Sequence, residues 1–314
     1  MDITNTLQTK NLTLSEKSHR LDSYIGQTPL YPINNLHQNE EVKIFAKLEW
    51  QQFGESVKAR PAYRIIQDAI TAGDLTMDKH LLDASSGNTG IAYAQIGAAL
   101  SIPVTLCLPE NASEERKQIL RALHVDLRLT SRSGGTDEAQ KVAKQIYENQ
   151  PEKYFYADQY GNPSNWKAHF DTTGPEILDQ TDYQITHFIT GLGTTGTFTG
   201  TGKILKEYNQ DIRLIGLQPN IAMHGLEGWK HLETAHRPDI YDDSVPDEIR
   251  SVSTELAYEL VKQTAHEEGL LISPSSAANL AGALQLADEI KEGTIVTIFP
   301  DDGSKYSEIY NQLF

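Results

Sequence analysis

Short apolar runs rich in β-branched residues alternate along this chain with longer segments whose apolar residues recur at helical spacing. The runs predict strands at residues 43–48, 80–84, 104–108, 125–129, 185–190, 213–217 and 295–299. The helical patterns between them cover residues 56–72, 112–123, 137–148, 197–207 and 254–268. Strands that alternate with helices pair in parallel, because the helix provides the crossover connection. The sequence therefore predicts an α/β fold with mostly parallel sheets covered by helices.

The length of 314 residues corresponds to about two domains. Residues 43–150 hold four strand–helix alternations, enough for one compact sheet, and the segment Asn149-Gln-Pro-Glu-Lys153 is a plausible crossing point. We predict a smaller domain at 45–150 and a larger one built from 1–44 and 151–314.

Charge and composition exclude several classes of function. The formal net charge of −16 argues against binding to nucleic acid, which requires clustered Lys and Arg. No apolar run approaches the roughly 20 residues of a membrane span, and the first 17 residues lack the apolar region of a signal peptide. The single cysteine, Cys107, permits no disulfide within the chain, which fits a reducing compartment. We therefore expect a cytoplasmic protein without a membrane partner. The histidines show no metal-ligand spacing, so no metal site is expected.

Three glycine- or serine-rich turns follow apolar runs and open helices: Ser85-Ser-Gly-Asn-Thr-Gly90, Gly191-Leu-Gly-Thr-Thr-Gly-Thr197 and Ser273-Pro-Ser-Ser-Ala277. The N-terminus of a helix attracts anions, and glycine lets the backbone approach them closely. The second turn matches the dinucleotide pattern G-x-G-x-x-G, but the next strand ends in Leu217-Gln-Pro-Asn220 without the carboxylate that a ribose requires. This favours a lone phosphate over a dinucleotide, although any one of these turns could equally be only a tight turn.

Lys58 lies at the start of a predicted helix, in Gly54-Glu-Ser-Val-Lys-Ala-Arg60. A lysine in such a place is ordinarily a solvated surface residue. It becomes a nucleophile when its pKa is depressed or an aldehyde is presented to it. A lysine combined with a phosphate loop indicates a cofactor that is both aldehyde and phosphate, pyridoxal 5′-phosphate.

With these motifs in order, the chain resembles the cysteine synthase group of fold-type II pyridoxal-phosphate enzymes. The further matching segments are Ile25-Gly-Gln-Thr-Pro-Leu30, Ala46-Lys-Leu-Glu49, Asp158-Gln-Tyr-Gly-Asn-Pro163, Thr172-Thr-Gly-Pro-Glu176, Glu268-Gly-Leu-Leu271 and Phe299-Pro-Asp-Asp-Gly-Ser-Lys-Tyr306. Thr195 and the segment His224-Gly-Leu-Glu-Gly-Trp-Lys-His231 are more similar to the B type than to the A type of this group. The resemblance implies a two-domain, tryptophan synthase β-like fold, in which the larger domain binds the cofactor and the smaller one is mobile.

The resemblance also implies a role for each matching residue. Lys58 would bind the cofactor's aldehyde and later remove the Cα proton of the substrate. The phosphate would be held by Gly193, Thr194, Thr195, Gly196 and Thr197, the ring oxygen by Asn88, and the ring nitrogen by Ser275. The substrate carboxylate would be held by Ser85, Ser86, Thr89 and Gln159. A serine at the ring nitrogen, unlike an aspartate, does not keep it protonated, which favours loss of the β-substituent over transamination.

The chain departs from the pattern of this group at several positions. Ala59 replaces an aspartate, Gln52-Phe53 replace Asn-Pro, Ala277 replaces a glycine, and Ser85 stands for a threonine. None of these changes removes a group that performs chemistry, but Phe53 and Ala59 could alter access to the site.

The resemblance implies an enzyme that makes L-cysteine from O-acetylserine or O-phosphoserine and sulfide or thiosulfate. The alternatives are serine or threonine dehydration, a cystathionine β-synthase-like reaction, or a weakly active paralogue that acts as a binding partner. The group implies a homodimer, and serine acetyltransferase is a conceivable partner that no residue here supports. Lys230 and His231 form a basic pair in an acidic chain, which suggests selection of an anionic substrate; a solvated helix face explains the pair equally well.

Overall fold

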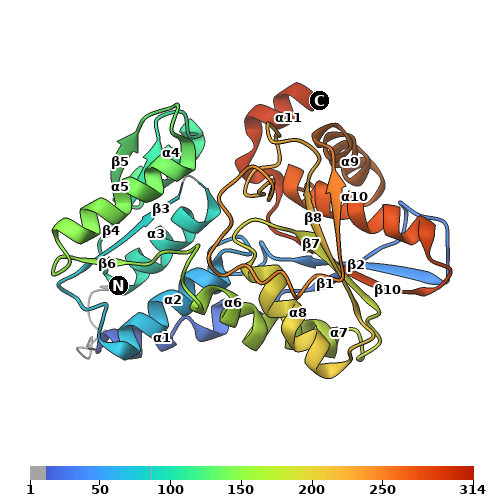
Figure 1. The fold of residues 1–314 in the computed structure, drawn as a ribbon, viewed down its shortest axis with the longest axis horizontal. Coiled ribbons are helices and arrows are strands. Elements are labelled where there is room, and N and C mark those ends of the chain that lie inside the picture. Colours follow the sequence, from blue (N-terminus) through green and yellow to red (C-terminus); the bar gives the residue numbers. More distant parts are fainter. Residues whose placement is uncertain (1–11, 86) are drawn as a thin grey trace, which may run out of the picture.

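The computed structural model describes residues 12–85 and 87–314, which form two lobes, each built on one sheet (Figure 1). The larger sheet has six strands in the order β1-β2-β10-β7-β8-β9. Their bounds are β1 (Leu30–Ile33), β2 (Val42–Leu48), β7 (His187–Gly191), β8 (Arg213–Pro219), β9 (Glu248–Val252) and β10 (Gly293–Phe299). Only the β1–β2 pair is antiparallel in this sheet.

The smaller sheet has four strands in the order β5-β4-β3-β6, and all of its pairs are parallel. Its strands are β3 (His80–Ala84), β4 (Val104–Pro109), β5 (Asp126–Thr130) and β6 (Tyr154–Tyr156). Every residue of β4 is buried, as expected of a central parallel strand covered on both faces.

Helices cover both sheets and fill the junction between the lobes (Figure 1). The smaller lobe carries α3 (Asn88–Leu100), α4 (Glu114–Ala122) and α5 (Gly135–Asn149). The larger lobe carries α7 (Gly174–Gln180), α8 (Gly196–Tyr208), α9 (Thr254–Glu267), α10 (Pro274–Glu289) and α11 (Ser307–Leu313). At the junction, α2 (Ala59–Ala72) packs against α3 and α6 (Ser164–Ala168), and α1 (Leu14–His19) packs on α2. None of the helices in the described part of the chain is both long and apolar enough to cross a membrane.

The predicted α/β class with mostly parallel sheets is confirmed, and each of the seven predicted strands is present within two residues of its expected bounds. Three strands were not predicted: β1, β6 and β9. Each has a weak pattern, because β1 contains Pro32, β6 has only three residues, and β9 is an edge strand that carries Glu248 and Arg250. The helix expected from residue 56 begins at Ala59 instead, after a turn.

The chain passes from one sheet to the other at places that differ from the predicted division at 45 and 150. All of β2 belongs to the larger sheet, because its residues pair with Gly293–Phe299 of β10. The chain then forms all four strands of the smaller sheet in succession, and the last of them, β6, pairs with β3. By sheet membership the smaller lobe therefore extends from β3 to β6, beyond the predicted crossing point at 149–153.

Candidate active site

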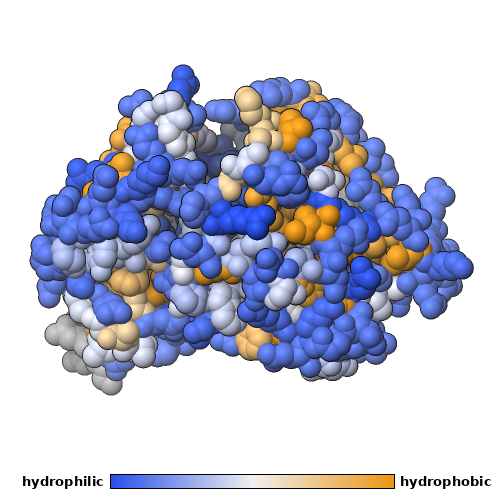
Figure 2. Space-filling model, in the orientation of Figure 1, coloured by the Kyte–Doolittle hydropathy of each residue, from blue (hydrophilic) through white to orange (hydrophobic). Residues whose placement is uncertain are grey.

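A cavity of about 230 Å³ lies between the two lobes, beyond the carboxyl ends of strands β3, β7 and β10. The space-filling view is hollowed between the lobes (Figure 2). Among the residues predicted for the site, those that line this cavity are Lys58, Ser85, Asn88, Thr89, Gln159, Gly193, Thr194, Thr195, Thr197, Lys230 and Ser275. Gly196 and His231 do not line it. Ser86 lies outside the described residues.

Lys58 immediately precedes the first residue of α2 and lies on the cavity wall. The turn before it needs Gly54, whose φ is +97° and whose Cβ, if present, would lie 2.7 Å from the Cβ of Ala59. Ala59 is itself fully buried. The turn before Lys58 therefore excludes any side chain at position 54, whereas nothing in the structure explains the alanine at position 59.

The Lys58 amine is the reactive group of the wall. Burial lowers its pKa, while the charges of Asp301 and Glu49 act in the opposite direction. The start of α2 also disfavours an ammonium, because the helix dipole places positive charge there. In the described part of the chain, the Nζ of Lys58 makes no hydrogen bond or ion pair with another side chain. A lysine with a lowered pKa and a free amine suits nucleophilic and proton-transfer chemistry.

The loop from Gly193 to Thr197 joins β7 to α8 and turns back sharply at Thr195, whose φ is +71°. A left-handed conformation is unusual for a β-branched residue and indicates a functional constraint. Close approach explains the glycines, since a Cβ on Gly193 would lie 2.1 Å from the carbonyl oxygen of Gly228, and one on Gly196 would lie 2.0 Å from Oδ1 of Asn165. The amides that open α8 thus border a compact anion site.

Side chains behind the loop fix its hydroxyl groups. Asn165 donates from Nδ2 to Thr194 Oγ1 at 3.1 Å, and His169 Nε2 lies 3.2 Å from Thr197 Oγ1. Burial, followed by the charges of Arg60 and Lys58, holds the pKa of His169 well below its usual value, so the imidazole is neutral. The buried Oγ1 of Thr195 has no hydrogen-bond partner among the described residues. A buried hydroxyl without a partner, beside a helix N-terminus, fits a bound phosphate whose oxygen would accept its hydrogen bond.

The segment between β3 and α3 forms the opposite wall. Ser85 Oγ accepts from Gly90 N at 3.0 Å, and Thr89 donates its hydroxyl to Oε1 of Gln159 at 2.7 Å. Gln159 is held in turn by Asp83, whose Oδ2 accepts from its backbone N at 3.2 Å. The start of a thirteen-residue helix therefore faces the cavity with its polar side chains already ordered, which suits a carboxylate ligand.

A carboxylate for which the sequence predicted no role lies behind the cavity wall, bonded to residues that line it. Asp301 is fully buried and accepts from Asn88 Nδ2 at 2.8 Å, from the hydroxyl of Tyr306 at 2.8 Å and from Ser275 Oγ at 3.4 Å. Asn88 Oδ1 is buried without a partner in the described part of the chain. Asp301 lies two residues beyond the end of β10, so the rule that ligands bind beyond strand ends could have found it.

The mouth of the cavity carries the charged side chains of Arg116, Glu227 and Lys230. Arg116 and Glu227 form an ion pair, and Lys230 Nζ lies 4.9 Å from the ring centroid of Tyr160. Burial lowers the pKa of Lys230, against the charge of Asp137. His231 points its Nδ1 to Thr234 Oγ1 at 2.9 Å instead of lining the cavity. The structure thus separates the basic pair, leaving Lys230 alone at the site.

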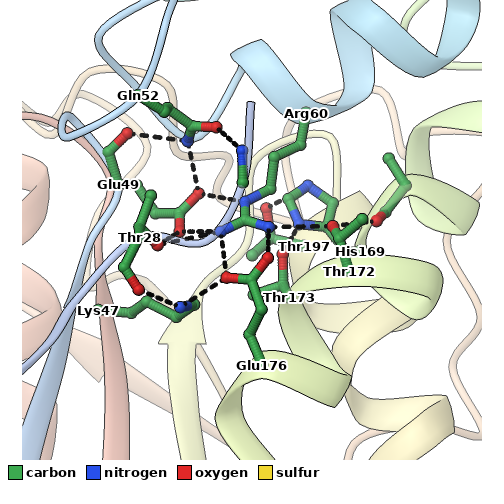
Figure 3. A network of polar contacts seen from close by, with 12 residues as sticks. Thr28, Lys47, Glu49, Gln52, Arg60, His169, Thr172, Thr173, Glu176 and Thr197 are labelled. Atoms are coloured by element: carbon green, nitrogen blue, oxygen red, sulfur yellow. Dashed lines mark hydrogen bonds and ion pairs between the residues drawn. The ribbon is translucent and has the colours of Figure 1, made fainter. Parts of the chain in front are cut away.

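A buried ion cluster anchors the start of α2 just behind Lys58 (Figure 3). Arg60 donates from Nε to Glu49 at 2.7 Å and from Nη2 to Glu176 at 2.8 Å, and Lys47 Nζ lies 2.7 Å from Glu176. Gln52, one of the departures from the family pattern, joins this cluster by donating to Glu49 Oε2 at 3.0 Å. The residues that flank Lys58 are therefore held rigidly while its own amine is left free.

The family described as "Pyridoxal-phosphate dependent enzyme" matches residues 21–301. This chain belongs to that family. The expected cofactor, pyridoxal phosphate, and the expectation of an enzyme are thereby confirmed. The family match runs through Lys58, the loop at 193–197 and Ser275, so it covers all of the lining residues except Tyr306.

Relatives and a solved structure extend the comparison. The chain is 46% identical to the cysteine synthase of Aquifex aeolicus over 90% of this chain and 88% of the relative. It is 34% identical to cysteine synthase B of Escherichia coli, over 91% and 93% of the two chains. The structure of the cysteine synthase of Entamoeba histolytica superposes with a TM-score of 0.87 at 30% identity, over 99% and 94%. The resemblance to the cysteine synthase group, drawn from motifs alone, is confirmed.

The residues present fit the cofactor that the family implies. The orphaned Thr195 hydroxyl, the unpartnered Asn88 amide oxygen and the free Lys58 amine all border one cavity. They belong to the three parts that a phosphorylated aldehyde requires: an anion site, a polar contact for the ring and an amine. Among the described residues, no group of three or more histidine, cysteine or acidic side chains is placed to hold a metal ion.

Proposed function

We propose that this enzyme replaces the β-substituent of an activated serine with sulfur, giving L-cysteine. The serine is O-acetylserine or O-phosphoserine, and the sulfur donor is sulfide or thiosulfate. The observation that carries the proposal is the unpartnered Lys58 amine, in one cavity with the loop at 193–197 and the helix N-terminus at Asn88. The names of the relatives support the same reaction.

In this proposal each wall has its own task. Gly193, Thr194, Thr195, Gly196 and Thr197 bind the cofactor's phosphate, while Asn88 and Ser275 contact its ring. Ser85, Ser86, Thr89 and Gln159 bind the substrate carboxylate. Bound pyridoxal phosphate supplies an electron-withdrawing ring that stabilises negative charge at Cα.

Lys58 performs the proton transfer. Its lowered pKa leaves a larger neutral fraction at physiological pH than an exposed lysine has, so the amine can accept the Cα proton. Loss of this proton accompanies loss of the β-substituent, and the same amine returns a proton to Cα after sulfur has added at Cβ. Because Lys58 is fixed by the start of α2, the acceptor stays near the reacting carbon.

We further propose that the smaller lobe is mobile and closes on the substrate, since the cavity lies between lobes whose sheets are separate. The homodimer and the cytoplasmic location expected from the resemblance remain proposals as well. Analytical ultracentrifugation would test the first, and cell fractionation the second.

The deciding experiment is an assay of the holoenzyme with each activated serine and each sulfur donor, with L-cysteine quantified as the product. We expect cysteine from at least one combination and little pyruvate or 2-oxobutanoate. Release of pyruvate from serine without sulfur incorporation would favour the dehydratase alternative, and cystathionine from homocysteine would favour the cystathionine alternative. Absence of turnover in all assays would favour a binding partner, to be tested with serine acetyltransferase.

A further inference from the structure

An ion pair joins the two lobes at the mouth of the cavity. Arg116, on α4 of the smaller lobe, donates from Nη1 to Oε1 of Glu227, which lies between β8 and β9 of the larger lobe. The Arg116 side chain is 3% exposed and that of Glu227 is 43% exposed. A second contact links the same parts, since Ser307 at the start of α11 donates to Glu115 Oε2 at 3.1 Å. In Figure 1, α4 and α11 face one another across the gap between the lobes.

Arg116 is held in place without help from Glu227. Its guanidinium carbon lies 5.0 Å from the ring centroid of Tyr306, and the Tyr306 hydroxyl donates to Asp301. The Nε of Arg116 is buried and has no hydrogen-bond partner in the described part of the chain. A buried donor without a partner is unfavourable, so this guanidinium has capacity to bind a further oxygen ligand.

Glu227 lies over the loop that faces the substrate carboxylate. Its Oε1 is 3.6 Å from the position that a Cβ on Gly87 would occupy, one residue before α3. The carboxylate therefore stands between Arg116 and the start of α3. Lys230 makes no ion pair with any side chain in residues 12–85 and 87–314, so it is the cation of the mouth that stays unpaired.

Arg116, Glu227 and Lys230 line the same cavity as Lys58, so a leaving group or a sulfur donor in this cavity lies near their charges. A phosphate ester brings about two negative charges at neutral pH, whereas an acetyl ester brings none. With Glu227 in place, Arg116 is already neutralised, and the carboxylate repels a dianion that approaches the same site. Without Glu227, the guanidinium would offer two parallel N–H groups, the geometry that suits a phosphate.

We propose that Glu227 selects the activated serine by the charge of its leaving group: by occupying Arg116 it favours the neutral acetyl ester over the dianionic phosphate ester. This deepens the proposed function and rests on it. In the reaction the Cβ–O bond breaks, its electron pair departs on acetate or phosphate, and the Cα proton passes to the Lys58 amine. Arg116 stabilises departing phosphate only when Glu227 does not hold it.

The test compares kcat/KM for O-phosphoserine with that for O-acetylserine, using sulfide as the common donor. Glu227→Gln keeps the size of the side chain and removes its charge, and we expect the ratio of phosphate to acetyl ester to rise about tenfold. The rise should vanish in the double variant Glu227→Gln/Arg116→Gln. Glu289→Gln is the matched control, because it breaks an ion pair with Arg250 that lies outside the cavity.

A binding measurement without turnover completes the test. In calorimetric titrations of the holoenzyme, the Kd for inorganic phosphate should fall about fivefold in Glu227→Gln relative to the wild type. The Kd for acetate should change much less. An unchanged ratio in Glu227→Gln, or a rise that persists without Arg116, overturns the proposal. If the wild type makes no cysteine from either ester, the proposed function itself fails; if it makes cysteine but the ratio does not move, only the role of Glu227 fails.

Discussion

Two lysines eleven residues apart in sequence, the fully buried Lys47 and the half-buried Lys58, have opposite surroundings. Lys47, in β2, is fully buried, and its Nζ contacts the carbonyl oxygen of Thr28 at 2.8 Å, Gln180 Oε1 at 2.9 Å and Glu176 Oε2 at 2.7 Å. Lys58 lines the cavity, and among the described residues its Nζ contacts no polar side chain. Burial lowers the pKa of both.

The difference separates a structural charge from a reactive one. All three donors of Lys47 are used, so its burial is compensated and its amine is not available to a ligand. Burial also lowers the pKa of Lys58, but no hydrogen bond or ion pair from a described side chain holds its amine, so the amine gains by bonding to something that enters the cavity. Saturation of the donors, not burial or pKa alone, distinguishes the two roles.

Lys58→Ala is the strongest test of this contrast. We expect cysteine formation to fall by roughly 10⁴-fold, because both the amine that holds the cofactor and the proton acceptor are lost. The thermal midpoint should stay within a few degrees, since Lys58 supports no structural contact. Steady-state kinetics and calorimetry measure the two effects, and normal turnover in the variant would show that another residue carries the chemistry.

Glu49→Gln tests the buried ion cluster around Arg60 instead. It leaves Arg60 without one of its two carboxylates, and a broken buried ion pair costs about 3–5 kcal/mol of unfolding free energy. Urea denaturation should detect this loss, while activity per folded molecule should fall far less than in Lys58→Ala. The exposed pair between Lys262 and Glu259 provides the control: Glu259→Gln should change stability by less than about 1 kcal/mol. Equal effects of the two variants would contradict the structural role of the cluster.

The pH dependence of stability should report the same cluster. Burial alone would raise the pKa of Glu176, but Arg60 and Lys47 lower it to about 2. A depressed carboxyl pKa stabilises the folded state fully above the unfolded value near 4.5, and this contribution is lost as pH falls from 4.5 towards 2. We expect about 3 kcal/mol to be lost over that range. In Glu176→Gln the urea midpoint should be lower than in the wild type at neutral pH, and it should change less as the pH falls from 4.5 towards 2.

The smallest expected effect concerns the mouth. Lys230→Ala should weaken kcat/KM for O-phosphoserine and thiosulfate by about 1–3 kcal/mol, with less change for O-acetylserine and sulfide. His231→Ala is the matched control, because His231 lies outside the cavity. An equal loss for all four substrate combinations would mean that Lys230 supports the local fold and does not select anions.

Motifs predicted most of the cavity wall, because each motif opens a helix within one stretch of chain. Lys58, Asn88, Thr195 and Ser275 could be named in this way. Asp301 and Glu227 lie within two of the matching segments, but the motifs assign neither of them a function. Arg116, on α4, lies in no motif. Their importance depends on partners more than 100 residues away, such as Asn88 for Asp301 and Glu227 for Arg116.

The sequence by itself determined seven of the ten strands that the structure describes, the class of fold and the glycine-dependent turns, since these follow from spacing and from backbone conformations available locally. Only the tertiary structure decided which of these two lysines has a free amine. Lys47 is saturated by Thr28, Gln180 and Glu176, which lie far apart along the chain, and nothing within a few residues of it signals this. Local propensity fixes where a helix begins, but the free energy of a buried charge depends on every group that the folded chain places around it.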